Sequence, residues 1–316
     1  MRRQGIGKCA LLLFLIYTAF VGGYVHGQTQ NMDYEPMVLD MVHHNPGEAP
    51  YQSVYNDPKV IKEMGYNGKV YFLFESPALA IDWESVDPDI LPKGSEDRKW
   101  VDAKAKQIKQ MHKACKAQDM KIFAMSDLVL FPKRLIAQYG IEETFGNPND
   151  PLTEKLIRAQ INEMFDQFPD LDGLVVRIGE TYLHDAPYHL GAIDNKKSPE
   201  KTIIPLMQIL KEEICEKRDK QLIFRTWGAF DVNLEDYLKV SDAIAFSKVI
   251  GQGRHPQIIE VQSAREYEGK GAYPNYIANG VIEGFEEHAR MPEGQINSIK
   301  EFVETKPGLY AGIWTW

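Results

Sequence analysis

The stretch DGLVVRIGETYLHD, Asp172 to Asp185, decides the fold class, because it begins as a buried strand and ends in charged residues. Its apolar, β-branched run at Gly173–Gly179 is typical of a parallel sheet that is covered on both faces. Arg177 and Glu180 fall at the end of this run, and the carboxyl ends of such strands are where functional groups collect. The stretch therefore predicts a parallel α/β fold with a polar site at its strand ends.

Similar runs recur along the chain, and helical patterns separate most of them. The predicted helices are 98–118, 151–168, 201–217 and 294–305; the second begins well, with Asp150 as its cap and Pro151 in its first turn. Eight strands alternating with helices predict a (β/α)₈ TIM barrel. The predicted strands are 36–44, 69–75, 121–129, 173–179, 221–228, 243–249, 258–262 and 308–316.

The two ends of the chain suggest further features. Basic residues followed by the apolar run CALLLFLIYTAFVGGYV predict a cleaved signal peptide at 1–28, although a membrane anchor is the alternative reading. We expect residues 29–316 to form the barrel domain of a periplasmic or extracellular protein with no stable membrane span. The chain ends at Trp316, within the eighth predicted strand, so we expect the final helix and any C-terminal domain to be lacking.

Charge and cysteine content limit the possible partners. The formal net charge of −9 argues against a nucleic-acid partner, which usually requires a basic face. Cys115 and Cys215 are the cysteines left after signal cleavage. Neither has metal-ligand spacing, and in an exported protein they are either bridged or, more commonly, free thiols.

Polar side chains follow the predicted strands at their carboxyl ends, where the loops of a barrel share one cleft. Glycoside hydrolysis needs two carboxylates, one to protonate the leaving oxygen and one to activate water or attack the sugar. Three cationic side chains at the same strand ends favour an anionic substrate, because an arginine side chain binds a carboxylate through two parallel hydrogen bonds. The sequence therefore predicts a uronic-acid site, and the candidate residues are His43, His44, Glu75, Arg177, Glu180, Arg225, Trp227, Lys248, Glu260 and Gln262.

Each of these residues also has a purely structural alternative. Arg177 could pair with Asp127 or Glu75 inside the barrel, and Glu180 could form a salt bridge within a loop. Glu260 lies mid-strand, where an unpaired glutamate is costly, so a role in the site is favoured.

The histidines do not predict a metal site. The first strand lacks the His-x-His pattern of metal-dependent amidohydrolases, and we expect neither a metal nor a cofactor. His184 and His189 could bind a metal together with Asp185, but substrate contact or a surface position is the more common outcome for loop histidines.

Four segments resemble consecutive strands of the family 67 glycoside hydrolases, the α-glucuronidases: DGLVVRIGE, IFRTWGAF, IAFSK and QIIEVQSAREYEGKG. The resemblance covers about Asp172 to Gly271, and its most specific part is the E-x-Q-x-x-x-E-Y-x-G pattern that begins at Glu260. It implies that Glu180 is the general acid and that Glu260 activates water, with inversion at the anomeric carbon. It also implies that Arg177, Arg225 and Lys248 bind the uronate carboxylate.

This sequence departs from the family's pattern in three ways. The segment VIGQGRHPQ carries no carboxylate where the family has a further aspartate base. The spacing from Arg177 to Glu180 is one residue shorter than the family's, and little of the flanking domains is visible. We therefore expect a distant relative that hydrolyses an acidic glycan. The alternatives are a barrel that binds acidic carbohydrate without cleaving it, and a retaining hydrolase of neutral sugars.

Overall fold

The computed structural model describes residues 38–42, 57–63, 65–71, 76–126, 129–176, 186–191, 201–225, 235, 257–261, 275–281 and 310–315. All of them belong to one compact unit, Pro36–Trp316.

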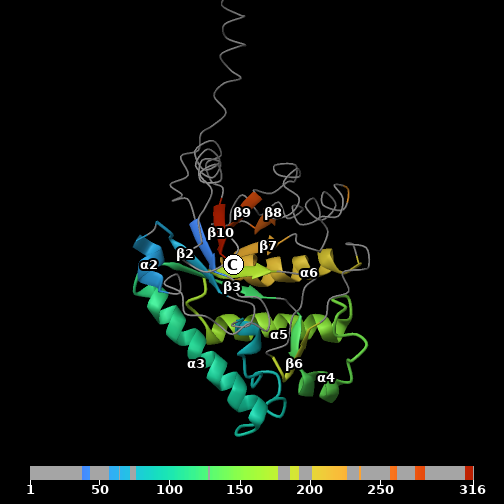
Figure 1. Ribbon diagram of the computed structural model, residues 1–316. Coiled ribbons are helices and arrows are strands. Elements are labelled where there is room, and N and C mark those ends of the chain that lie inside the picture. Colours follow the sequence, from blue (N-terminus) through green and yellow to red (C-terminus); the bar gives the residue numbers. More distant parts are fainter. Residues whose placement is uncertain are drawn as a thin grey trace, which may run out of the picture. The chain divides into compact units, whose positions relative to one another are not determined.

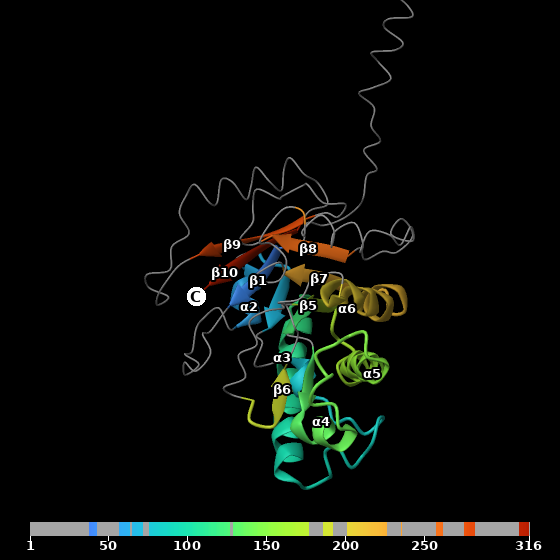
Figure 2. The same ribbon diagram turned by 90° about the vertical axis from the view of Figure 1, so that its right-hand side faces the viewer.

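Eight parallel strands form a closed barrel in this unit (Figures 1 and 2). The first strand is hydrogen-bonded to both the second and the last, and this pairing closes the ring. In ring order the strands are β1 (Val38–Val42), β2 (Gly68–Tyr71), β3 (Lys121–Ser126), β5 (Gly173–Val176), β7 (Gln221–Arg225), β8 (Gln257–Val261), β9 (Asn275–Val281) and β10 (Tyr310–Thr315).

The stagger of the strands is that of a (β/α)₈ barrel. Starting at Leu39 on β1, we find its register partner on the next strand and repeat this step around the ring until the path returns to β1. Where a paired stretch is too short, its residue numbering is extended in the same register. The path returns at position 31, which is 39 − 31 = 8 residues from its start. A shear of about eight for eight strands defines the (β/α)₈ geometry. The prediction of a parallel α/β fold is therefore confirmed, and the strands have the number and stagger of this barrel.

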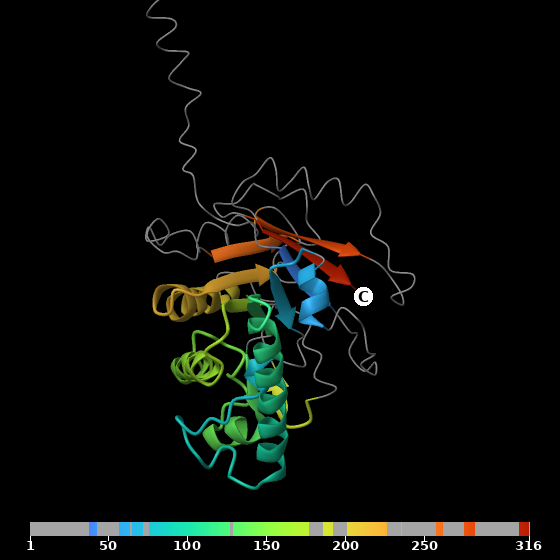
Figure 3. The ribbon, with the colours of Figure 1, turned by 90° about the vertical axis from the view of Figure 1, so that its left-hand side faces the viewer.

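Helices connect the first five strands of the ring. They are α2 (Pro58–Glu63), α3 (Glu96–Lys116), α5 (Pro151–Gln167) and α6 (Ile203–Leu210), which the π-helix η5 (Lys211–Glu216) continues. Figure 3 shows α2 and α3 on the side turned toward the viewer. The start of α5 is as predicted, because the Asp150 carboxylate accepts a hydrogen bond of 2.9 Å from the Thr153 N–H.

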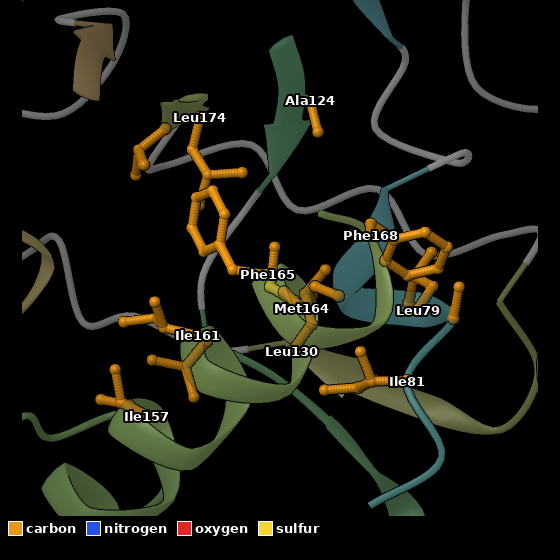
Figure 4. Packing of buried hydrophobic residues seen from close by; sticks show 14 of the residues in the cluster. Leu79, Ile81, Ala124, Leu130, Ile157, Ile161, Met164, Phe165, Phe168 and Leu174 are labelled. Carbon is orange, nitrogen blue, oxygen red and sulfur yellow. The ribbon is translucent and has the colours of Figure 1, made fainter. Parts of the chain in front are cut away.

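The two faces of the strands pack differently. Ile122 and Ala124 of β3 and Leu174 of β5 belong to the apolar cluster that the helices cover, and Figure 4 shows Ala124 and Leu174 with residues of α5. Phe123 and Val175, on the opposite faces of the same strands, are buried outside that cluster. Because side chains alternate along a strand, this second set faces the barrel interior.

A two-stranded ribbon joins the segments that follow β3 and β5. Its strands, β4 (Leu130–Pro132) and β6 (His189–Gly191), pair in the antiparallel sense, and α4 (Lys133–Tyr139) follows β4 directly. Figures 1 and 2 both show β6 and α4 lying together. The Lys133 backbone N–H donates to the Tyr188 carbonyl at 2.8 Å, which strengthens the connection.

The strand predictions hold for seven of the eight ring positions, mostly with shorter bounds. The sequence analysis missed β9, and it placed a strand at 243–249 that lies outside the described residues. β7 is hydrogen-bonded directly to β8, so no ring position is open between them. Glu260 is therefore on the sixth strand of the ring, not on the seventh as predicted. The predicted helix at 294–305 also lies outside the described residues.

Candidate active site

The stagger sorts the inward positions into layers. Because the strands are staggered, the residue at a given height on one strand lies one position beyond the register partner of the residue at that height on the strand before it. Inward-facing residues on alternate strands therefore share a level when they are displaced by two residues from exact register. One such level, here called the glutamate layer, consists of Val70, Val175, Glu260 and Gly312. The next level toward the carboxyl ends, the arginine layer, consists of Met41, Met125, Arg225 and Ala278.

The interior positions change in character along the strands: Lys121 and Gln221 lie at the amino ends, and apolar levels separate them from Glu260 and Arg225 near the carboxyl ends. The level beneath the glutamate layer consists of Leu39, Phe123, Ile223 and Tyr276. Glu260 and Arg225 bring charge into the two levels above it. The charged positions near the carboxyl ends make this mouth of the barrel the candidate active site, because barrel enzymes build their sites there.

Arg225 and Glu260 adjoin each other in this mouth. They are direct register partners on β7 and β8, so they occupy the same face of the sheet on strands about 4.8 Å apart. A carboxylate among apolar positions such as Val70 and Val175 is costly unless a cation balances it. The register places an arginine position directly beside the glutamate position.

A buried pair of hydroxyls joins the end of β3 to the segment that begins at Ser76. The Ser76 Oγ donates a hydrogen bond of 2.9 Å to the Ser126 Oγ, and neither residue is exposed to solvent. Ser76 also accepts from the Ala78 N–H at 3.2 Å and so caps the 3₁₀ helix η3 (Pro77–Leu79). Ala78 and Leu79 of this helix are part of the apolar core.

His189 is a correction to the sequence analysis, which expected a substrate contact or a surface group. Its side chain is buried, with 1% of the residue exposed, and its ring lies 5.5 Å from the Trp100 ring. Neither ring nitrogen has a hydrogen-bond partner among the described residues. Burial lowers the pKa of His189 to about 4, so the ring is neutral at pH 7 and acts as packing.

A cleft of about 740 Å³ opens between α3, α5 and the segment at 82–85. Its buried carboxylate, Glu163, accepts hydrogen bonds from the backbone N–H groups of Trp83 (2.8 Å) and Ser85 (3.0 Å). Two further carboxylates, Asp82 and Asp102, pair with Arg98. These groups hold the segment against the helices. The cleft lies on the helix side of β3 and is separate from the barrel mouth.

The other predicted site residues lie outside the described residues. By sequence, His43, Arg177 and Gln262 directly follow the last residues of β1, β5 and β8. His44, Glu75, Glu180 and Trp227 come within a few residues of a strand end. Lys248 falls between β7 and β8 in the chain, where the sequence analysis had expected a strand.

Two polar residues that the structure brings into buried positions were not predicted. Ser126 ends β3, and Glu163 projects from the buried face of α5. A glutamate on the apolar face of the pattern INEMF was a usable signal, because buried carboxylates require partners. No comparable sequence pattern indicated that the two serines would be buried as a pair.

The described residues show three further features of the chain. They contain no group of three or more His, Cys, Asp or Glu side chains that could hold a metal ion. Cys115 and Cys215 are not joined in a disulfide bond within the described residues. Across the part of the chain that the structure describes, no helix combines the length and apolar character that crossing a membrane requires.

The chain is similar in fold to solved structures of carbohydrate-active enzymes. It matches a GH138 enzyme targeting pectin rhamnogalacturonan II with a TM-score of 0.51 and 15% identity, covering 92% of this chain and 36% of that one. The chain thus spans about a third of that enzyme's length. At this identity the match shows the fold alone.

Two further matches have TM-scores below 0.5. One is a GH18 chitinase from Pseudoalteromonas aurantia (TM-score 0.45, 12% identity, 89% of this chain and 94% of that one). The other is a D-psicose 3-epimerase (TM-score 0.45, 8% identity, 89% and 85%). No family model matches the chain, and no curated protein sequence does. The resemblance to family 67 therefore stays a prediction.

Proposed function

We propose that the chain is an exported glycoside hydrolase that removes a terminal uronic acid, or a similar acidic sugar, from an oligosaccharide or polysaccharide. The observation that carries the proposal is the direct pairing of the Arg225 and Glu260 positions near the carboxyl ends of β7 and β8, above apolar interior levels. A cation and a carboxylate at a strand-end mouth suit an anionic sugar and its hydrolysis. The fold shared with a GH138 enzyme is consistent with this reading.

The roles follow from the chemistry of inversion. Glu180 protonates the glycosidic oxygen, and Glu260 stays ionised beside Arg225 and directs water to the opposite face of the sugar ring. Arg177, Arg225 and Lys248 hold the uronate carboxylate. Contacts to the rest of the sugar come from His43, His44, Glu75, Trp227 and Gln262.

The proposal extends to the parts of the chain outside the described residues. Residues 29–316 make up the barrel domain, and residues 1–28 act as a signal peptide that directs the protein to the periplasm or the extracellular space.

A substrate panel tests the activity directly. Oligosaccharides with and without a terminal uronic acid, including fragments of rhamnogalacturonan II, are incubated with the full chain. We expect release of the acidic sugar alone, with the inverted anomer detected first by proton NMR. Release of the retained anomer would contradict the mechanism, and release of neutral sugars alone would contradict the substrate class. Binding of uronic acid without release would indicate a non-catalytic barrel.

Two variants separate the roles of the carboxylates. Glu260→Gln should lower kcat by about 10²–10⁴-fold on every substrate, because water activation is needed whatever the leaving group. Glu180→Gln should impair natural glycosides but spare aryl uronides, whose good leaving group needs no acid. Glu142→Gln, an exposed glutamate after α4, is the matched control and should behave as wild type. Full turnover by Glu260→Gln would overturn the proposal.

A further inference from the structure

The cleft between α3, α5 and the segment at 82–85 has a row of lysines along one wall. Lys106, Lys109 and Lys113 of α3 line it, and their spacing of three and four residues places them on one face of the helix. All three are exposed. With a rise of 1.5 Å per residue, the row is about 10 Å long. A cleft of about 740 Å³ is roomy enough for a small ligand beside this row.

The lysine row is not balanced by acids. Within the part of the chain that the structure describes, no acidic side chain forms an ion pair with any of the three lysines, and the Nζ of Lys109 lies 5.8 Å from the centre of the Phe168 ring. The acids of α3 all precede Ala103, whereas five lysines follow it. Like charges three and four residues apart repel, and the helix dipole favours cations only in the last turn, which accounts for Lys113 but not for Lys106. The row is therefore a local excess of positive charge.

Most of the carboxylates that line the cleft already have partners within the fold. Asp82 and Asp102 pair with Arg98, at 3.2 Å and 2.8 Å. Glu163 accepts hydrogen bonds from two backbone N–H groups of the segment at 82–85. Asp166 also lines the cleft, and no ion pair involves it among the described residues. The groups left to bind a ligand are thus the three lysines and one carboxylate.

The wall opposite the lysines is held in a fixed shape. Trp83 adopts the left-handed conformation, with φ of 60°, which is rare for a bulky side chain and persists only where the surroundings enforce it. Its side chain is fully buried, and its ring packs edge-on against Phe131 with the ring centres 5.5 Å apart. The bond from its N–H to Glu163 fixes its backbone. A cleft formed in advance lowers the cost of ordering groups when a ligand binds.

The lining suits a sugar that carries carboxylates. Ser85 and Gln110 are exposed polar groups of the cleft, and with Asp166 they offer donors and acceptors for sugar hydroxyls. The lysines offer charge-assisted hydrogen bonds to carboxylates. Inorganic sulfate presents acceptors alone, and Asp166 repels it. An acidic oligosaccharide matches both kinds of group.

We infer that this cleft is a second carbohydrate-binding site, which holds an acidic oligosaccharide along the lysine row. The site is separate from the barrel mouth and goes beyond the proposed hydrolysis, because its ligand follows from the lining of the cleft alone. In a hydrolase, a second site on the same chain keeps a polymeric substrate close by raising its effective concentration.

Lysine footprinting locates the site. The full chain is acetylated with and without a tetramer of galacturonic acid, and mass spectrometry measures the modification of each lysine. We expect protection of Lys106, Lys109 and Lys113, but not of the exposed lysines of the control set, Lys99, Lys155 and Lys201. Equal protection by the methyl-esterified, neutral tetramer, or by sodium sulfate at matched ionic strength, would overturn the assignment of an acidic sugar.

A triple variant measures the contribution of the row. Lys106→Gln/Lys109→Gln/Lys113→Gln should lower the number of tetramers bound per chain by one in calorimetry, whereas Lys99→Gln/Lys155→Gln/Lys201→Gln should keep the wild-type number. Turnover of a single aryl uronide should be unchanged in both variants, because that substrate occupies the barrel mouth.

The outcomes separate the two proposals. An unchanged number of bound tetramers, or an absence of lysine protection, would overturn this inference and leave the proposed function standing. A loss of aryl uronide turnover in the triple variant of the row would show that the lysines act through the fold, and would also overturn it. A wild-type chain that binds the tetramer at the lysines but cleaves no acidic sugar would overturn the proposed function and leave this site standing.

Discussion

Arg225 and Glu260 are direct register partners on β7 and β8, and their positions face the barrel interior one level apart. The two residues are of opposite charge, and both positions lie near the carboxyl ends of the strands. An arginine and a glutamate at paired positions can serve the fold alone, or they can serve a ligand. Selectivity between acidic and neutral sugars distinguishes these two roles.

Replacement of Arg225 should therefore affect acidic ligands selectively. Arg225→Gln is expected to raise KM for a uronide by roughly 10- to 100-fold, the equivalent of about 1.5–3 kcal/mol for a hydrogen bond to a charged group. Arg225→Lys keeps the charge but loses the forked geometry of the guanidinium group. Its KM for the uronide should therefore fall between those of the wild type and Arg225→Gln. Steady-state kinetics on matched uronide and neutral substrates provide the measurement.

Lys155→Gln, an exposed cation on α5, serves as the control and should change neither substrate's KM. An equal rise in KM for both substrates, together with a lower melting temperature, would indicate that Arg225 serves only the fold.

The sequence predicted those strands whose own residues form a recognisable apolar pattern. The run GLVV at Gly173–Val176 is apolar throughout, as a strand buried on both faces must be, and the prediction there was correct. β9 carries the sequence NYIANGV, in which Asn275, Asn279 and Gly280 interrupt the apolar pattern. Pairing with β8 and β10 sets that strand, and such pairing is not readable from the segment alone.

The candidate site was likewise predictable from the sequence only in part. Charged residues at strand ends were recognisable because parallel strands deliver their carboxyl ends to one edge. The levels were not recognisable, because they depend on the stagger between strands. Glu260 and Arg225 are direct partners, yet they belong to different layers, and only the register reveals this. His189 also read as a loop group in sequence, whereas packing against Trp100 buries it.

Gly173 should tolerate no side chain. A Cβ at this position would lie 2.2 Å from the backbone oxygen of Gln221 and 2.7 Å from Cε1 of Phe123. The backbone oxygen belongs to the neighbouring strand and cannot move without breaking the β5–β7 pairing. Gly173→Ala should therefore cost more than about 3 kcal/mol or prevent folding.

Gly140, which ends α4 in the left-handed conformation with φ of 61°, provides the contrast. A Cβ there meets no atom within 4 Å, so Gly140→Ala should cost only about 1 kcal/mol of backbone strain. Urea denaturation followed by circular dichroism compares the two variants. Equal costs would show that close strand packing at Gly173 is not the constraint.

His189 should make the protein less stable in mild acid. Burial lowers its pKa from 6.5 to about 4, while the charge of Asp97 acts to raise it and that of Lys133 to lower it. A depressed pKa contributes stability that is fully present above the unfolded value, about 6.5, and is lost as the pH falls toward 4. At pH 5 the loss amounts to roughly 2 kcal/mol.

His189→Phe keeps an aromatic ring against Trp100 and forfeits no hydrogen bond seen among the described residues. The variant should match wild type at pH 7.5 and exceed its unfolding free energy by about 2 kcal/mol at pH 5. His112, whose pKa burial also lowers to about 4, is present in both proteins, so its contribution cancels. A difference that is the same at both pH values would contradict the assignment.

Glu163 should hold the segment at 82–85 through its carboxylate. Glu163→Gln keeps the size of the side chain but replaces one acceptor oxygen with an NH₂ group, which then faces the N–H of Trp83 or Ser85. A buried donor without an acceptor costs about 1–3 kcal/mol. Asp166→Asn, one turn further along α5 and exposed, is the matched control and should change stability by less than about 0.5 kcal/mol.

The pH dependence of this variant gives an independent check. Burial raises the pKa of Glu163 above 4.5, although hydrogen bonds from Ser85 and Trp83 act in the opposite direction. With the folded pKa above the unfolded one, the native state binds more protons, so this group's contribution is fully present below about pH 4.5 and declines as the pH rises through the folded pKa. The glutamine does not titrate. The stability deficit of Glu163→Gln should therefore narrow between pH 4 and pH 7, and a deficit that widens over this range would mean that the hydrogen bonds to the ionised carboxylate outweigh its burial.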